Sequence, residues 1–321
     1  MASPVIKVTS KSFSSHPVLR EELRAAFPSA VFNDRSRGYT EEEIIAYFDG
    51  ADGVVVGLEP ITEQVLAACP DLKIVSKYGV GLDNIDQAAC INRHVHIGWT
   101  GGVNRRGVAE MALCYMIGLS RNVFFAARRL RDRQDWTKAG GTDLSGRTIG
   151  LIGVGHIGKE VVGLLQPFGC SILVNDIIDQ TEYYEANGVQ EASKDDIYVN
   201  SDIISIHTPL DNSTRALINA RVFNAMKNDA YFINVARGGV VDQGALKAAL
   251  KDHQIAGAAI DVFEMEPSND IAFLNLPNLY CTPHTGGSSA ESILAMGRSS
   301  ISHLVEYFGS ERWDLGGAQK R

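Results

Sequence analysis

Thr148-Ile-Gly-Leu-Ile-Gly-Val-Gly-His-Ile-Gly158 is the stretch that decides the fold of the larger part of this chain. Its first five residues, Thr148–Ile152, form a short apolar run that predicts a buried strand. A helical pattern of apolar residues begins at His156 and continues to Phe168. The glycines between the two elements follow the pattern Gly-x-Gly-x-x-Gly, and this strand–turn–helix context gives the pattern its meaning.

Each glycine of the turn has its own physical role in a dinucleotide-binding unit. Gly153 permits the tight turn, Gly155 lets the backbone approach a pyrophosphate, and Gly158 lets the helix pack closely on the strand. The amides at the start of the helix attract phosphates, so His156 and Ile157 are expected beside them. The alternative is an ordinary strand–helix turn without a ligand.

An acidic residue stands at the distance from the glycines that is typical of a dinucleotide-binding unit. The next predicted strand, Ser171–Asn175, is followed by Asp176, about 20 residues beyond the glycines. A carboxylate there would bind the hydroxyls of the adenosine ribose. Ile177 and Ile178 come next rather than an arginine, so no cation would balance the negative charge of the 2′-phosphate of NADP. The sequence therefore predicts NAD as the cofactor.

Short apolar runs alternate with helical patterns along the whole chain, which is typical of parallel sheets covered by helices on both faces. The predicted strands are Val5–Thr9, Gly53–Val56, Lys73–Ser76, Thr148–Ile152, Ser171–Asn175, Asp202–Ile206, Tyr231–Asn234, Ile255–Ile260 and Leu279–Cys281. The predicted helices include Pro17–Phe27, Thr62–Ala68, His156–Phe168 and Gln243–Leu250. We expect an α/β fold of two Rossmann-like domains, each with a doubly wound parallel sheet, and a cleft between them.

Two longer helical patterns interrupt the alternation and suggest where the chain passes between the domains. One begins near Asn104 and runs towards Leu130, and the other spans about Ser288 to Phe308. We predict a substrate-binding domain of residues 1–103 plus 289–321 and an NAD-binding domain of residues 104–288. The apolar final helix and the following Trp313 favour this return over a simple split into an N-terminal and a C-terminal half.

Composition limits the classes of partner. The chain has 321 residues and a formal net charge of −8, which argues against a nucleic-acid partner because phosphate binding needs a basic surface. It lacks the long apolar run that a membrane span requires. Its five cysteines form no Cys-x-x-Cys, and residues 1–9 lack a signal-peptide pattern. We expect a cytoplasmic protein with reduced thiols and no metal site.

Three segments that follow predicted strands carry side chains suited to proton transfer and carboxylate binding. They contain Arg237, Glu266 and His284. Ligands of open α/β sheets bind at the carboxyl ends of the strands, so these residues should emerge on one edge. Each has a simpler explanation on its own, such as a surface arginine, a glutamate that ends a strand or a structural histidine.

With these motifs the sequence resembles the D-isomer-specific 2-hydroxyacid dehydrogenases over nearly its whole length. The resemblance rests on several motifs in the same order, namely Lys77-Tyr-Gly-Val-Gly-Leu-Asp-Asn-Ile-Asp86, Val108-Ala-Glu110, the glycine turn, His207-Thr-Pro-Leu210 and the segments 234–239, 261–267 and 282–287. It implies hydride transfer between nicotinamide and C2 of a small 2-keto or D-2-hydroxy acid.

The resemblance also implies roles for individual residues. His284 would be the general acid and base, Glu266 would orient its imidazole, and Arg237 would bind the substrate carboxylate and keto oxygen. The loop Tyr78, Gly79, Val80 and Gly81 would bind the same carboxylate through its amides, from the other side of the cleft. The residues around the cofactor would be Val108, His207, Thr208, Pro209, Val235, Ala236, Asp261 and Gly287, with Asp261 at the carboxamide.

Other implications are less specific. Lys77 would reach a distal anion of the substrate or simply be solvated. The segment from Arg121 to Trp136 would pack against a second subunit in a homodimer, and Trp136 would approach the partner's cleft.

Two rival functions remain open. One is an NAD(H)-sensing binding protein like the corepressors of the same superfamily, and the other is a phosphite dehydrogenase. Glu266 argues against formate as the substrate, because formate dehydrogenases have glutamine there.

Overall fold

The computed structural model describes residues 3–35, 37–138 and 140–309, and its contacts divide the chain into two compact units. One unit consists of residues 1–104 and 289–321, and the other of residues 105–288. The division at 104/105 lies one residue from the predicted boundary, and the division at 288/289 coincides with it. Trp313, used to predict the return, lies outside the described residues.

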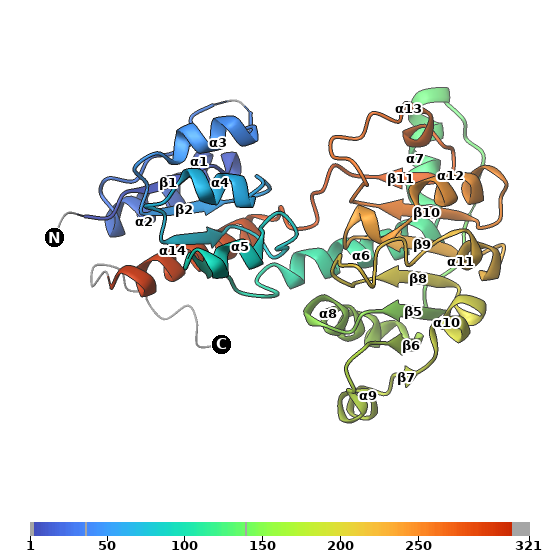
Figure 1. Cartoon of the computed structure of the whole chain (residues 1–321). Helices are drawn as coiled ribbons and strands as arrows, with labels where there is room; N and C mark the ends of the chain where they lie inside the picture. The colour runs from blue at the N-terminus through green and yellow to red at the C-terminus, as the bar shows by residue number, and fades with distance from the viewer. Residues whose placement is uncertain (1–2, 36, 139, 310–321) are drawn as a thin grey trace. The chain divides into compact units, whose positions relative to one another are not determined.

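The first unit has a parallel sheet of four strands in the order β1-β2-β3-β4. They are β1 (Ile6–Val8), β2 (Gly53–Val56), β3 (Ile74–Lys77) and β4 (His96–Gly98). A parallel bridge from Lys7 to Val31 extends the sheet beyond β1, so the chain runs outward there and returns to place β2 on the other side. This reversal at β1 makes the sheet doubly wound. Its helices are α1 (Lys11–Ser15), α2 (Pro17–Ala26), α3 (Glu41–Phe48), α4 (Glu63–Ala68), α5 (Gln87–Asn92) and α14 (Ala290–Phe308), as Figure 1 shows.

Both faces of this sheet are buried, as an all-apolar strand requires. In β2, Val55 belongs to the core beneath α1, α2 and α14, whereas Val54 and Val56 belong to the core beneath α3, α4 and α5. Helix α14 packs closely on α2, because a Cβ on Gly297 would lie 2.3 Å from Leu19. The final helix therefore completes the first unit.

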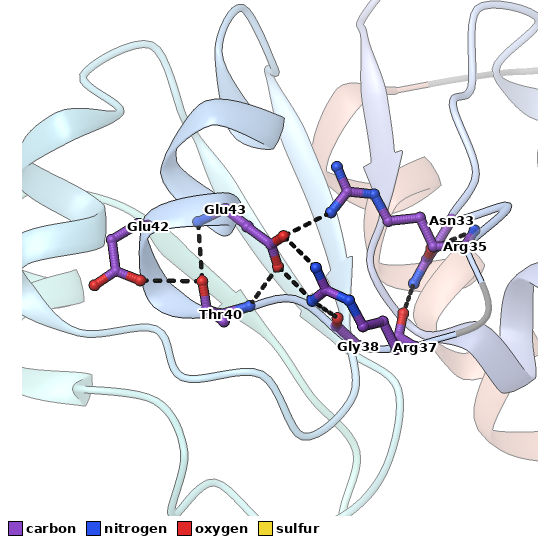
Figure 2. Close-up of polar contacts among 7 residues, drawn as sticks. All are labelled: Asn33, Arg35, Arg37, Gly38, Thr40, Glu42 and Glu43. Carbon is purple, nitrogen blue, oxygen red and sulfur yellow. Dashed lines mark hydrogen bonds and ion pairs between the residues drawn. The ribbon is translucent and has the colours of Figure 1, made fainter.

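An ion cluster fixes the start of α3 (Figure 2). The side chain of Thr40 accepts a hydrogen bond from the Glu43 amide, and the Glu43 carboxylate accepts one from the Thr40 amide at 3.0 Å, which is a capping box. Arg35 and Arg37 bind the same carboxylate at 3.1 and 2.6 Å. These hydrogen bonds, first that from Arg37, lower the pKa of Glu43 to about 2.

The second unit has a seven-stranded parallel sheet in the order β11-β10-β9-β8-β5-β6-β7 (Figure 1). Its strands are β5 (Thr148–Ile152), β6 (Ser171–Asn175), β7 (Gln190–Glu191), β8 (Ile203–Ile206), β9 (Tyr231–Asn234), β10 (Gly257–Ile260) and β11 (Leu279–Cys281). Its helices are α6 (Arg105–Ser120), α7 (Val123–Arg133), α8 (His156–Leu165), α9 (Thr181–Asn187), α10 (Lys194–Asn200), α11 (Ala220–Ala225), α12 (Gln243–Lys251) and α13 (Ile271–Leu274). The strand order reverses between β5 and β8, which is where doubly wound sheets bind ligands.

All nine predicted strands are present, five of them with the predicted bounds. Strands β4 and β7 escaped prediction. Neither offers an apolar run, since His96 in β4 and both residues of β7 are exposed. They are edge strands that the hydrophobic pattern does not reveal.

The prediction of one continuous helix from Asn104 to Leu130 is wrong. It is two helices, α6 and α7, bent by 65° at Asn122, whose φ is +55°. Ser120 is the last residue of α6. Its carbonyl accepts a hydrogen bond at 2.7 Å from the amide of Thr142, which lies outside the helix. Within the described part of the chain no single helix is long and apolar enough to cross a membrane, and only this bent pair passes by length and composition.

Candidate active site

The glycine turn between β5 and α8 forms a cradle that side chains could not share. Gly153 has φ +94°, and a Cβ there would lie 2.7 Å from the backbone of His207. A Cβ on Gly158 would lie 2.3 Å from the Gly153 carbonyl oxygen. Helix α8 begins at His156, and Gly155 before it offers no capping side chain, which leaves the first amides of the helix for an anionic ligand. These features fit the pyrophosphate of a dinucleotide, with His156 and Ile157 in the first turn.

Asp176 lies against the same turn. Its carboxylate accepts the amide of Val154 at 2.6 Å and the amide of Ile178 at 3.1 Å. Asp176, the residue predicted to bind the ribose, is therefore held at the glycine turn, at the end of β6. Ile177 and Ile178 beside it are exposed and uncharged.

His207, Thr208 and Pro209 follow β8, on the other side of the point where the strand order reverses. His207 is buried, and its Nε2 lies 3.0 Å from the hydroxyl of Ser205. Burial lowers the pKa of His207 to about 4, so the imidazole is neutral at pH 7. Among the described residues, its Nδ1 and the Thr208 hydroxyl have no hydrogen-bond partner. Such orphaned atoms beside the glycine turn fit a bound polar ligand.

Arg237 stands one loop further along the same edge, after β9. The amide side chain of Asn234 fixes the turn, since it donates to the Arg237 carbonyl at 2.9 Å and accepts from the Ala236 amide at 3.0 Å. The partly buried Arg237 donates to the Ala236 carbonyl at 2.7 Å. Val235 and Ala236, both predicted near the cofactor, are buried.

Glu266 and His284 form the pair that the family resemblance implies. The Oε2 atom of Glu266 lies 2.7 Å from the Nδ1 atom of His284, and its Oε1 atom accepts the amide of Phe263 at 2.9 Å. Burial alone would raise the pKa of Glu266, but these hydrogen bonds and the charges of His284 and Arg237 lower it overall. The carboxylate is therefore ionised at neutral pH. Both side chains remain about 30% exposed, so a ligand can reach the imidazole.

The three catalytic candidates therefore belong to one edge of the nucleotide-binding sheet. A Cβ on Gly238 would lie 1.9 Å from the carbonyl group of Phe263, so the loop after β9 packs directly on the loop after β10. This contact brings Arg237 to the segment that ends in Glu266. The charge of Arg237 is accordingly one of the causes that lower the pKa of Glu266.

Asp261 has a further role besides the one the sequence predicts. Its carboxylate is 1% exposed and accepts the amides of Thr285 and Gly286, both at 2.7 Å. Its carbonyl accepts the amide of His284 at 2.8 Å. Val108 of α6 lies next to Gly286, because a Cβ there would be 3.7 Å from it. Asp261 thus holds the loop of His284, next to Gly287.

His284 adopts a backbone conformation that needs such support. Its φ of +55° is unusual for a residue with a side chain and costs on the order of 1–3 kcal/mol. Strain of this kind persists only where the surroundings hold it, and here the carbonyl and carboxylate of Asp261 do so.

In the first unit, the predicted substrate loop follows β3. Gly79 has φ +132°, a conformation that favours glycine, and the Trp99 indole donates to the Val80 carbonyl at 2.7 Å. Lys77 is buried rather than solvated, and its ammonium group donates to the Gly57 carbonyl and, at 2.6 Å, to Asn84. Sequence reasoning missed Asn84 as the partner of Lys77, although it lies within the quoted motif.

Across residues 3–309, apart from 36 and 139, no group of three or more His, Cys, Asp or Glu side chains is placed to hold a metal ion.

Comparison with known proteins identifies this architecture. Residues 113–286 match the family model described as "D-isomer specific 2-hydroxyacid dehydrogenase, NAD binding domain". D-3-phosphoglycerate dehydrogenase from Rattus norvegicus is 36% identical over 83% of this chain and 50% of its own length, so the chain spans about half of that relative. Glyoxylate reductase from Korarchaeum cryptofilum is 35% identical, with 78% and 77% covered.

A solved structure agrees. The NADPH-dependent glyoxylate/hydroxypyruvate reductase from Sinorhizobium meliloti, in complex with NADP and malonate, has a TM-score of 0.84 and 28% identity over 96% of this chain and 95% of its own.

Proposed function

This chain belongs to the D-isomer-specific 2-hydroxyacid dehydrogenase family, and we propose that it is an NAD-dependent oxidoreductase that interconverts a small 2-keto acid and the D-2-hydroxy acid. The observation that carries the proposal is the Glu266–His284 pair, 2.7 Å apart, on the edge of the sheet that also holds Arg237 and the glycine turn. A structural ion pair would not need to lie at this edge.

The proposed chemistry follows from these side chains. When bound, NADH supplies the hydride that adds to C2 of the keto acid. Arg237 binds the substrate carboxylate and orients the keto oxygen, because a guanidinium offers a planar fork of donors. His284 gives a proton from Nε2 to the keto oxygen, since Nδ1 is bound to Glu266. The Glu266 carboxylate stabilises the imidazolium before the transfer, and His284 takes the proton back in the oxidation direction.

The cofactor preference rests on Asp176. The carboxylate lies at the glycine turn, where it would bind ribose hydroxyls and repel a 2′-phosphate. We propose NAD for this chain, although the Sinorhizobium meliloti relative is NADPH-dependent.

We also propose that the loop 78–81 binds the substrate carboxylate through its amides, and that the protein is a homodimer in the cytoplasm. Helix α7 supports the dimer, because it buries none of its residues and exposes Val123 and Leu130, with Trp136 79% exposed just beyond it. Apolar surface of this kind commonly marks a protein interface. Sedimentation of the purified protein measures its oligomeric state, and a monomer at micromolar concentration would contradict the dimer.

A panel of 2-keto acids tests the function, with NADH oxidation followed by absorbance. We expect turnover with at least one small member such as glyoxylate or hydroxypyruvate, and little with NADPH. An NADH-sensing protein would bind NADH with no turnover on any keto acid, and a phosphite dehydrogenase would instead reduce NAD with phosphite. Either result would overturn the proposal.

A further inference from the structure

The loop that carries His284 is connected by hydrogen bonds to the interior of α6. The hydroxyl of Thr282 donates to the Oδ1 atom of Asp261 and is also in short contact with the hydroxyl of Tyr115. Thr282 has one hydroxyl hydrogen, and Asp261 receives it. Tyr115 must therefore be the donor in its contact with Thr282. The hydrogen bonds run in one direction, from Tyr115 through Thr282 to Asp261.

The ring of Tyr115 is fixed by its packing, and its hydroxyl contacts Thr282. Tyr115 is 1% exposed and packs edge-on against Phe124 and Tyr280, with 6.3 and 6.0 Å between the ring centroids. Burial raises the pKa of Tyr115 above its ordinary value, so the phenol keeps the hydrogen that it donates. An aromatic side chain fixed in this way offers a rigid donor.

Asp261 transmits this contact to His284. The carboxylate binds residues on both sides of the histidine, namely Thr282 before it and Thr285 and Gly286 after it. The histidine ring is fixed separately by Glu266. If the Thr282 hydroxyl turned away from Asp261, the loop would lose one of the contacts that maintain the left-handed backbone of His284.

We propose that Tyr115 is a positioning residue for His284, because its hydroxyl orients Thr282 towards Asp261 and so holds the loop 282–286 in the arrangement required for proton transfer. This inference rests on the proposed function. Asp261, Thr282 and His284 all follow strands of the sheet, whereas Tyr115 lies in α6. No sequence motif singled out Tyr115.

Tyr115→Phe tests the inference because it removes only the hydroxyl and keeps the ring. We expect kcat for keto-acid reduction to fall about tenfold, since small misplacements of a catalytic group are costly. The dissociation constant of NADH should stay within about twofold. Thr282→Val should cause a similar loss, Thr282→Ser should restore most activity, and the double variant Tyr115→Phe/Thr282→Val should lose no more than the worse single variant.

Tyr280→Phe is the matched control, because it takes a hydroxyl from the same aromatic cluster and leaves the Tyr115–Thr282 contact in place. Its kcat should stay near that of the wild type. A second readout needs no cofactor or substrate: the NMR signal of the His284 ring, assigned with His284→Asn, should broaden or split in Tyr115→Phe and not in Tyr280→Phe.

The outcomes separate the two proposals. If the wild type reduces a keto acid while Tyr115→Phe keeps its kcat and its His284 signal, the positioning role is wrong and the proposed function stands. If Tyr280→Phe loses as much activity as Tyr115→Phe, the role is also wrong, because the loss then reflects packing alone. If the wild type reduces no keto acid, the proposed function is wrong, and the His284 signal decides the positioning role by itself.

Discussion

Glu43 and Glu266 are bound in nearly the same way, yet only one of them belongs to a candidate active site. Each carboxylate accepts a hydrogen bond from a backbone amide, contacts a basic side chain within 2.7 Å, and has a lowered pKa. Their side chains are 28% and 30% exposed, so accessibility does not distinguish them. Figure 2 shows the Glu43 cluster at the start of α3.

The difference lies in the partner. Arg37 cannot give up its proton in a protein, so the Glu43 cluster can only cap a helix. An imidazole, unlike a guanidinium, can give up a proton and take it back, so the same geometry at Glu266 can serve proton transfer. Location adds to this, since Glu266 is near the ligand edge of a sheet whereas Glu43 begins a helix. An ion pair with a shifted pKa is therefore no evidence of catalysis until its partner and place are considered.

The largest expected effect is on the proton donor. His284→Asn should lower kcat for keto-acid reduction by about 10³-fold, because asparagine cannot transfer the proton. Asparagine tolerates the left-handed backbone at this position better than alanine does, so the loop should stay in place. Fluorescence titration should find NADH binding unchanged. A kcat within tenfold of the wild type would remove His284 from the mechanism.

Glu266→Gln should have the next largest effect, about a 10²-fold loss of kcat. The protonated imidazole loses its negative partner and the contact that orients its ring, so proton transfer should become less efficient. Glu264→Gln is the control, since that exposed carboxylate two residues away binds the amide of Gln243 instead of a histidine. Equal losses in the two variants would show that the Glu266–His284 contact has no special role.

Asp176→Ser should lower the preference for NADH over NADPH by about tenfold or more, because the carboxylate no longer repels the 2′-phosphate. The ratio of kcat/KM for the two cofactors measures this. Asp179→Ser removes the same charge from an exposed position three residues further along, where Thr181 is its partner, and should leave the ratio unchanged. An unchanged ratio in Asp176→Ser would contradict the ribose contact.

The smallest effect is expected at Glu43. Glu43→Gln should leave kcat unchanged and lower Tm by roughly 2 °C or less, since exposed ion pairs contribute little. The pKa of Glu43 is about 2 in the folded protein and lies near 4.3 in an unfolded chain, so its stabilisation is present above pH 5 and is lost as the pH falls towards 2. Calorimetry should find the Tm difference at pH 7 and a smaller one at pH 3. A change in kcat would contradict the comparison.

The sequence predicted the elements whose identity is encoded locally. Strands such as Thr148–Ile152 are apolar on both faces, and the glycine turn carries its own steric requirements, so both were predicted with their bounds. The break between α6 and α7 was not predictable in this way. It depends on a hydrogen bond from Thr142 to the carbonyl of Ser120, made by a segment about twenty residues away.

The candidate site likewise contains residues that the sequence could predict and contacts that it could not. Arg237, Glu266 and His284 could be named from the sequence because each follows a strand, and parallel strands bring their carboxyl ends to one edge. Three other contacts could not be predicted from the sequence. They are the hold of Asp261 on the loop of His284, the burial of Lys77 against Asn84 and the contact of Tyr115 with Thr282. Hydrogen bonds between residues distant in the chain depend on where side chains end after packing, and no local pattern encodes that.

The sequence by itself determined the parallel α/β architecture, the nucleotide turn and the residue types at the edge of the sheet, because hydrophobic periodicity and glycine sterics act over a few residues. Only the tertiary structure decided the contacts that no motif implies, such as those of Tyr115 with Thr282 and of Lys77 with Asn84. Such contacts need the whole sheet, since the strands that carry them are brought together by packing and not by their separation in the chain.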